Sequence, residues 1–137
     1  MTELPTYLGR HLGRPLAADE MAASSEATIP AATHLREVVF TSTELSANCP
    51  VTGQPDLYST TISYRPTGGL CLESKALKHY LWGFRDRGIF AEDLASQIAE
   101  DLHTTLNAAV DVELIQQVRG GLTLTVRATA PTAGAVA

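Results

Sequence analysis

Two apolar stripes with helical spacing follow one another in the middle of the chain, and they constrain the fold more than any other feature. The first, within residues 73–85, places apolar side chains at steps of three and four: Leu77, Tyr80, Leu81 and Phe84. The second, within residues 91–107, repeats every four residues: Leu94, Ile98, Leu102 and Leu106. Each pattern predicts a helix with one apolar face, and such a face must be buried against another layer of structure.

Strand patterns flank this pair of helices on both sides. Residues 34–43 are rich in apolar side chains, and alternating apolar and polar residues mark three further strands: 57–65, 110–114 and 122–126. Gly120-Gly121 is typical of a hairpin turn between the last two. The order is ββααββ. It predicts an α+β domain in which two antiparallel helices cover one face of a four-stranded antiparallel sheet.

The predicted domain spans residues 34–128, which leaves a segment at each end. Between Ala17 and Thr33 the chain is rich in Ala, Ser, Thr and Glu and has few large apolar residues. Residues 1–33 are therefore predicted to be an N-terminal extension, partly disordered. Residues 129–137 are expected to be a loose C-terminal tail.

The predicted sheet has two open edges, and each edge presents unpaired backbone groups. A closed ring of subunits would pair these edges. We therefore expect a cyclic homo-oligomer.

Charge and composition exclude several classes of function. The net charge is −5 and no run of Lys or Arg is present, so a nucleic-acid surface is not expected. No apolar run approaches the ~18 residues that span a membrane, and the N-terminus shows no signal peptide. Cys49 and Cys71 are too far apart for a CxxC motif. We expect a small-molecule partner and a cytoplasmic protein without a disulfide, in which Cys71 is a packing residue.

A short loop bounded by Pro and Gly holds the first candidate nucleophile. Cys49 precedes Pro50, and Asp56 follows seven residues later, where the loop meets a strand. An accessible cysteine thiolate is a nucleophile, and a carboxyl group beside it can donate or accept a proton. A packed thiol and a turn aspartate would give the same pattern, so these residues alone leave both interpretations open.

Two segments resemble known motifs of one family. Cys49-Pro50-Val51-Thr52-Gly53-Gln54-Pro55-Asp56 resembles the active-site segment of the nitrile reductases that act on 7-cyano-7-deazaguanine. Glu73-Ser74-Lys75-Ala76-Leu77-Lys78-His79-Tyr80 resembles that family's signature associated with NADPH binding, and Arg119-Gly120-Gly121 also resembles the family. The resemblance covers residues 34–126.

The resemblance implies a fold, a reaction and an assembly. The family has the tunnel fold, whose ββααββ units join into rings, here a pentamer or decamer, with a barrel of sheets and with active sites between subunits. Cys49 would attack the nitrile to give a thioimide, and Asp56 would be the general acid. NADPH would reduce this adduct to 7-aminomethyl-7-deazaguanine, a precursor of the tRNA base queuosine. No metal is expected.

The resemblance also assigns binding residues. Ser74, Lys75 and Lys78 would bind the phosphates of NADPH, although two lysines three residues apart are equally typical of a solvated helix face. Glu92 would bind the purine-like edge of the substrate with two parallel hydrogen bonds, although a helix start favours a carboxylate in any case. Further substrate contacts are expected from Phe90 and, across the subunit boundary, from Glu73 and Ser74.

One position departs from the family pattern. Ala91 stands where members typically carry a histidine, which would supply a hydrogen bond and a proton relay. Two alternatives to the reductase stay open. One is a relative that forms the thioimide but passes it to ammonia on archaeal tRNA. The other is a deazapurine-binding protein without turnover.

Overall fold

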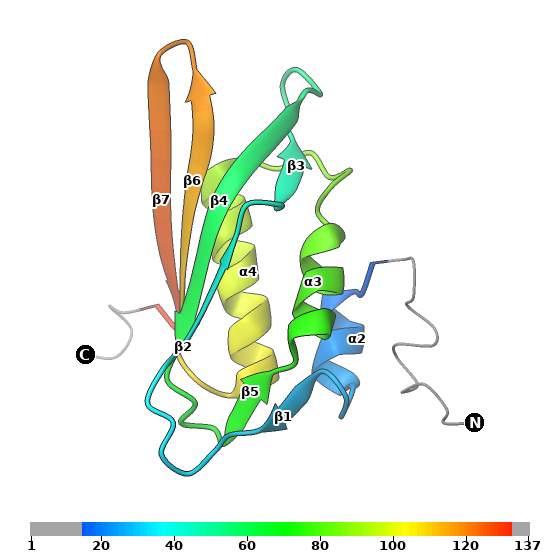
Figure 1. Ribbon diagram of the computed structural model, residues 1–137. Coiled ribbons are helices and arrows are strands. Elements are labelled where there is room, and N and C mark those ends of the chain that lie inside the picture. Colours follow the sequence, from blue (N-terminus) through cyan, green and yellow to red (C-terminus); the bar gives the residue numbers. More distant parts are fainter. Residues whose placement is uncertain (1–14, 133–137) are drawn as a thin grey trace.

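The computed structural model describes residues 15–132, and its centre is an antiparallel sheet (Figure 1). The strand order is β2-β4-β6-β7, and a short strand, β3, pairs with the first residues of β4. The bounds are β2 Val38–Ser42, β3 Ser46–Asn48, β4 Pro55–Tyr64, β6 Val110–Arg119 and β7 Leu122–Ala130. All pairings in this sheet are antiparallel. The predicted α+β class is confirmed, and so is the ββααββ order of the four main strands and the two long helices, with β3 as an addition to this sheet.

Two antiparallel helices lie on one side of this sheet, as the apolar stripes predict (Figure 1). α3 spans Ser74–Trp82 and α4 spans Ala91–Leu106. Glu73 caps α3, because its carboxylate accepts hydrogen bonds from the backbone N–H groups of Lys75 and Ala76. α4 packs directly against β6 and β7, whereas α3 faces β2 and β4 across a cavity. Within residues 15–132, no helix is long and apolar enough to cross a membrane.

The face of β4 toward the helices carries every second side chain of the strand. These buried residues are Asp56, Tyr58, Thr60, Ile62 and Tyr64. The alternation follows from the period of two along a strand. It places the candidate acid, Asp56, on the helix side of the sheet, in line with the core.

The N-terminal segment differs from its prediction. Residues 18–23 form a helix, α2 (Ala18–Ala23), and β1 (Thr28–Pro30) pairs with β5 (Leu70–Leu72). The expectation of partial disorder in residues 1–33 is therefore wrong for residues 15–33, while residues 1–14 lie outside the described part. The physical reason is that three apolar residues of this segment are fully inside the core: Leu16, Met21 and Ala27 are 1%, 0% and 0% exposed.

The other boundaries shift by a few residues. The first predicted strand is shorter, since β2 begins at Val38, and β6 continues five residues past the alternating stretch, to Arg119. β7 extends to Ala130, which is 4% exposed, so residues 129 and 130 are part of the sheet and not of a tail. Residues 133–137 lie outside the described range.

A buried hydrogen bond joins the two long helices and predicts a loss of stability on mutation. The Tyr80 hydroxyl donates to Oδ2 of Asp101 at 2.5 Å, and Tyr80 is 3% exposed. Burial, and then this carboxylate, raise the pKa of Tyr80. Tyr80→Phe should lower the free energy of unfolding by about 1–2 kcal/mol, measured by urea denaturation. In an Asp101→Asn background the same change should cost less. Equal losses in both backgrounds would show that the two groups act independently.

Candidate active site

The loop that carries Cys49 is closed by backbone hydrogen bonds and tied to the start of α4. Within the loop, the Cys49 N–H donates to Gln54 O and the Gly53 N–H donates to Cys49 O, both at 2.8 Å. Gly53 has φ 71, a left-handed conformation that favours glycine. Asn48 receives a hydrogen bond from Ile89 N (3.1 Å) and donates to Arg87 O (2.8 Å). These bonds bring the cysteine loop beside the segment that leads into α4.

The electrostatic surroundings of Cys49 favour a thiolate. The pKa of the half-buried Cys49 thiol lies below its ordinary value, chiefly because the Thr52 side chain hydrogen-bonds to the sulfur. The backbone N–H groups of Thr52 and Val51 act in the same direction, while burial and the charge of Asp56 oppose them. A lowered pKa and partial exposure are what a nucleophilic cysteine needs. Cys71, in contrast, is buried at 7% exposure, as expected of a packing residue.

The hydroxyl of Thr52 gives a direct test of this arrangement. Thr52→Val should raise the pKa of Cys49 toward its ordinary value, because the largest stabilising contact of the thiolate is lost. Alkylation of Cys49 by iodoacetamide, followed by peptide mass spectrometry across pH, should slow severalfold at neutral pH. Thr52→Ser keeps the hydroxyl and serves as the control. An unchanged pH profile in the valine variant would show that backbone groups alone stabilise the thiolate.

Asp56 is buried and paired with an arginine from a distant strand. Its exposure is 3%, and Oδ1 lies 2.7 Å from Nη2 of Arg119, at the end of β6. The alignment is that of an ion pair and not of a good hydrogen bond, since Oδ1 has no hydrogen-bond partner. The same Arg119 Nη2 donates to Pro55 O at 2.8 Å. Arg119 therefore holds both the backbone and the side chain at the start of β4.

Tyr58 and Gln116 complete this end of the sheet, and sequence reasoning did not assign them. Burial, and then the charge of Asp56, raise the pKa of Tyr58 to about 12. Glu92 acts weakly in the same direction, so it too lies close enough to interact. Gln116 Nε2 donates to the Tyr58 hydroxyl at 3.3 Å. The sequence did contain a signal for Tyr58. Residues two apart on a strand point to the same face, so Tyr58 had to lie on the face that carries Asp56.

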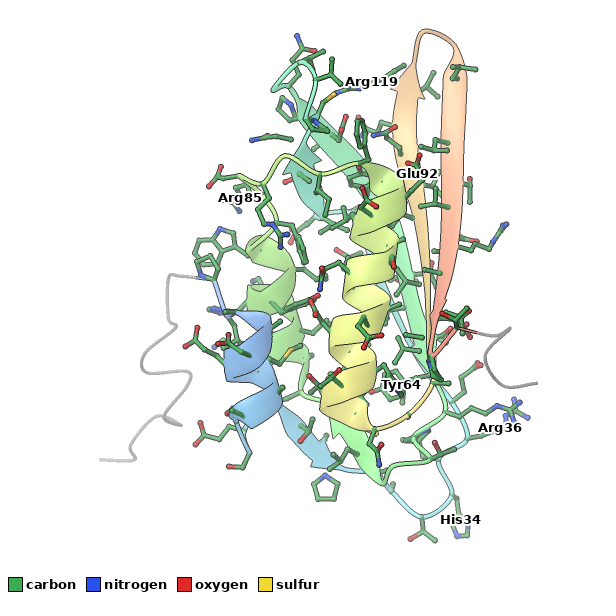
Figure 2. The ribbon with its side chains drawn as sticks, turned by 180° about the vertical axis from the view of Figure 1, so that it is seen from behind. His34, Arg36, Tyr64, Arg85, Glu92 and Arg119 are labelled. Atoms are coloured by element: carbon green, nitrogen blue, oxygen red, sulfur yellow. The ribbon has the colours of Figure 1, made fainter. Side chains whose placement is uncertain are left out.

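The two residues expected to contact substrate lie near the start of α4. Glu92 is in the first turn and exposed, and Figure 2 shows it at the same end of the molecule as Arg119. Phe90 is the N-cap residue and is 51% exposed, so it is not an ordinary core residue. Ala91 between them is 3% exposed. The position where the family typically has a histidine is thus filled by a core alanine.

The remaining predicted residues are not brought together with Cys49 within one chain. Glu73, Ser74 and Lys75 lie at the start of α3, next to β5, whereas β3, which leads into the Cys49 loop, lies at the other end of that helix (Figure 1). Nine residues of helix separate the two ends, which is about 14 Å. The Glu73 carboxylate is also engaged as the cap of α3. A second chain would be needed to bring Glu73 or Ser74 to the cysteine.

A cavity of about 650 Å³ lies between α3 and the β2–β3–β4 side of the sheet. Apolar side chains such as Phe40, Leu77 and Leu81 form much of its wall, and Ser74, Lys78 and Arg85 also line it. Its volume is typical of a ligand pocket. Apolar walls with two cations fit a phosphorylated aromatic group such as NADPH. Among residues 15–132 there is no cluster of three or more His, Cys, Asp or Glu side chains that could hold a metal ion.

The chain has relatives among known sequences. The family described as QueF-like protein matches residues 55–134. A Frankia casuarinae protein named NADPH-dependent 7-cyano-7-deazaguanine reductase is 40% identical over 119 residues, which are 86% of this chain and 92% of that protein. The protein of that name from Syntrophobacter fumaroxidans is 38% identical over 120 residues, 87% of this chain and 76% of its own length. The Syntrophus aciditrophicus protein of that name is 42% identical over 92 residues, and the match spans 66% of this chain and 65% of that protein.

A solved structure has the same fold. The crystal structure of the archaeosine synthase QueF-Like in the apo form superposes with a TM-score of 0.59 at 20% identity. The superposition covers 77% of this chain and 95% of that one. At this identity the likeness concerns the fold alone, and it agrees with the expected tunnel fold.

Proposed function

The chain belongs to the QueF-like protein family, and we propose that it reduces the nitrile of 7-cyano-7-deazaguanine to an aminomethyl group with NADPH. The observation that carries this proposal is the Cys49 thiol, whose pKa is lowered, in a loop beside the buried Asp56. A nitrile carbon accepts hydride poorly, and a thiolate positioned with a proton donor converts it into a better acceptor. The product would enter queuosine biosynthesis.

The covalent step uses the chain's own groups. The Asp56 carboxylate, paired with Arg119, takes the proton of the Cys49 thiol as the sulfur forms a bond to the nitrile carbon. Asp56 then delivers this proton to the nitrile nitrogen, which gives a thioimide on the protein. When bound, one NADPH molecule would supply a hydride to this carbon, and a second NADPH molecule would supply another hydride after Cys49 has left. Between the two reductions the C–S bond breaks, Cys49 leaves as the thiolate and an imine remains. Arg119 keeps the Asp56 carboxyl group at the start of β4 throughout.

Substrate recognition falls to Glu92 and Phe90. The Glu92 carboxylate is exposed at the start of α4 (Figure 2). It can accept two parallel hydrogen bonds from the N–H groups on the aminopyrimidinone edge of a deazaguanine. The exposed Phe90 ring next to it offers a flat apolar surface for the heterocycle. Asn48, held by Arg87 and Ile89, keeps this binding edge at a constant distance from Cys49.

The cofactor is assigned to the α3 side of the molecule. Ser74 and Lys78 line the cavity, and Lys75 is exposed one turn before Lys78. Lysine ammonium groups suit phosphate oxygens as point charges. A reduced thiol and NADPH both suit the cytoplasm, where we place the protein.

We further propose that the protein is a cyclic homo-oligomer with sites between subunits. Large apolar side chains are exposed along the β6–β7 hairpin: Ile115, Val118, Leu122 and Leu124. β2 and β7 are the outer strands of the sheet order. Pairing of these edges in a ring would cover apolar surface and bring Glu73 and Ser74 of one chain toward the Cys49 loop of the next. Solution scattering that gives a monomer mass at low micromolar concentration would contradict this assembly.

Turnover with 7-cyano-7-deazaguanine tests the reaction itself. Purified protein should oxidise two NADPH molecules per nitrile. The reaction is monitored by the loss of NADPH absorbance, and the amine is identified by mass spectrometry. This result would also show that Ala91 is compatible with catalysis. A thioimide adduct on Cys49 without NADPH oxidation would favour the ammonia-transfer alternative. Substrate binding without an adduct or oxidation would favour a binding protein.

A further inference from the structure

The hydroxyl of Tyr58 is buried beside the proposed general acid, and only its oxygen is used in hydrogen bonding. Tyr58 is 2% exposed and Asp56 is 3% exposed, and the two side chains lie on the same face of β4. The Tyr58 oxygen accepts a hydrogen bond from Gln116 Nε2 at 3.3 Å, but the hydroxyl proton has no acceptor within residues 15–132. Buried hydrogen-bond donors are rarely left unused. The unused proton therefore indicates a ligand that supplies an acceptor.

The Tyr58 hydroxyl interacts with charges at both ends of the proposed substrate site. Burial, and then the charge of Asp56, raise the pKa of Tyr58 to about 12, and Glu92 acts weakly in the same direction. At this pKa the phenol keeps its proton throughout the physiological pH range. It is too weak an acid to replace Asp56 as the proton source. Its use in the site is therefore that of a hydrogen-bond donor.

The substrate presents its polar groups in a fixed order along one edge. The nitrile comes first, the ring carbonyl oxygen is next to it, and the ring N–H and the amino group follow. Under the proposed function the nitrile lies at Cys49 and Asp56, while Glu92 accepts hydrogen bonds from the two N–H groups. The carbonyl oxygen then lies between Asp56 and Glu92, and Tyr58 interacts with both of these residues. This oxygen is an acceptor, which the Tyr58 proton needs.

We propose that the Tyr58 hydroxyl donates a hydrogen bond to this ring carbonyl oxygen, and that Gln116 orients the hydroxyl for this role. The inference rests on the proposed function and deepens it, because it adds a residue that selects the substrate. Gln116 is opposite Tyr58 in the register of β4 and β6. Its N–H group occupies the phenol oxygen, so the phenol proton is turned toward the substrate. A purine with an amino group in place of the carbonyl would bring a donor against this donor, so the pair favours guanine-type over adenine-type bases.

Tyr58→Phe removes the hydroxyl and keeps the ring that fills the core. Binding is measured by isothermal titration calorimetry in a Cys49→Ala background, where no adduct forms. The affinity for 7-cyano-7-deazaguanine should fall about tenfold, while the urea midpoint is retained. In the protein that carries Cys49, KM should rise by about the same factor and kcat should change little, because no proton passes through Tyr58.

An analogue with sulfur in place of the carbonyl oxygen tests the partner atom. It keeps the nitrile and both N–H groups, but a thione sulfur is a weak hydrogen-bond acceptor. The Cys49→Ala protein should bind it about tenfold more weakly than the carbonyl compound. With Tyr58→Phe added, the two compounds should bind about equally well. Gln116→Met, which has no N–H group, should reduce the preference for the carbonyl compound without abolishing binding.

Tyr64→Phe is the matched control. Tyr64 is a second buried tyrosine on the same face of β4, at 3% exposure, and it lies toward the other end of the molecule from Glu92 and Arg119 (Figure 2). Its hydroxyl accepts a hydrogen bond from the Leu72 N–H at 2.8 Å. Loss of this hydroxyl should lower the stability and leave the affinity for both compounds unchanged.

Several results would overturn the inference while the proposed function stands. They are an unchanged affinity of Tyr58→Phe for the carbonyl compound, equal affinities of the Cys49→Ala protein for the two compounds, and a fall in kcat of Tyr58→Phe at unchanged KM. The second result needs no change at Tyr58, so it applies even if Tyr58→Phe does not fold. The expected affinities in a protein that oxidises no NADPH would support the inference and remove the proposed function. Absence of any binding of 7-cyano-7-deazaguanine would overturn both.

Discussion

Cys49→Ala is expected to abolish nitrile reduction, with a rate below about one ten-thousandth of the wild-type rate, since the covalent bond to the nitrile carbon is formed by the Cys49 sulfur. NADPH absorbance should stay constant in the presence of 7-cyano-7-deazaguanine, and intact-mass spectrometry should show no adduct. Substrate affinity should change little, because Glu92 and Phe90 are untouched.

The second cysteine provides the matched control for this result. Cys71→Ala removes a thiol that is 7% exposed and lies on β5, away from the catalytic loop, so it should keep the adduct and most of the activity. Substantial NADPH oxidation by Cys49→Ala would contradict a thioimide mechanism. Loss of the adduct in a folded Cys71→Ala variant would show that Cys71, and not Cys49, is the nucleophile.

Asp56→Asn is expected to lower the rate of reduction by about a hundredfold or more, because the amide cannot deliver a proton to the nitrile nitrogen. The variant is nearly isosteric, so the start of β4 should keep its shape and Arg119 can still donate to Pro55 O. The adduct at Cys49 should form slowly, and the amine should form more slowly still. Single-turnover mass spectrometry separates the two stages. A wild-type rate would show that Asp56 is an ion-pair partner and not the acid.

Arg119 should affect the same reaction in a different way. Arg119→Ala removes the cation 2.7 Å from Asp56 Oδ1 and leaves a buried carboxylate without its partner, so both rate and stability should fall. Arg119→Lys should restore part of the rate, because it restores a charge near Asp56. Arg127, which forms an exposed ion pair with Glu113 at 2.8 Å, is the matched control. Arg127→Ala should leave rate and stability nearly unchanged.

The order of strands and helices was predictable because apolar periodicity is a local property. Leu94 to Leu106 repeat with a helical period whatever they pack against, and Tyr58 to Tyr64 alternate on a strand in the same way. The candidate nucleophile and acid were identified for a similar reason, since Cys49 and Asp56 lie in one short segment that resembles a known motif. The roles of these two residues remain predictions until the variants above are measured.

The prediction from sequence failed near the N-terminus, because large apolar residues are sparse there. Leu16, Met21 and Ala27 are separated by stretches of small and polar residues, so no window of the sequence contains a convincing apolar face. They are nevertheless fully buried, because α2 packs against α3 and α4 and because β1 finds a partner in β5. Burial of this kind depends on surfaces supplied by distant residues.

By itself, the sequence determined the four main strands and the two long helices, and the short segment that carries the thiol and the carboxyl group. The tertiary structure alone decided what surrounds them. Arg119 reaches Asp56 because β4 and β6 pair in one register, and Thr60 lines a cavity because α3 stands off the sheet at β2 and β4. Both results depend on pairing and packing between residues far apart in the chain. Local periodicity carries no information about such contacts, since it specifies the face of an element and not its neighbour.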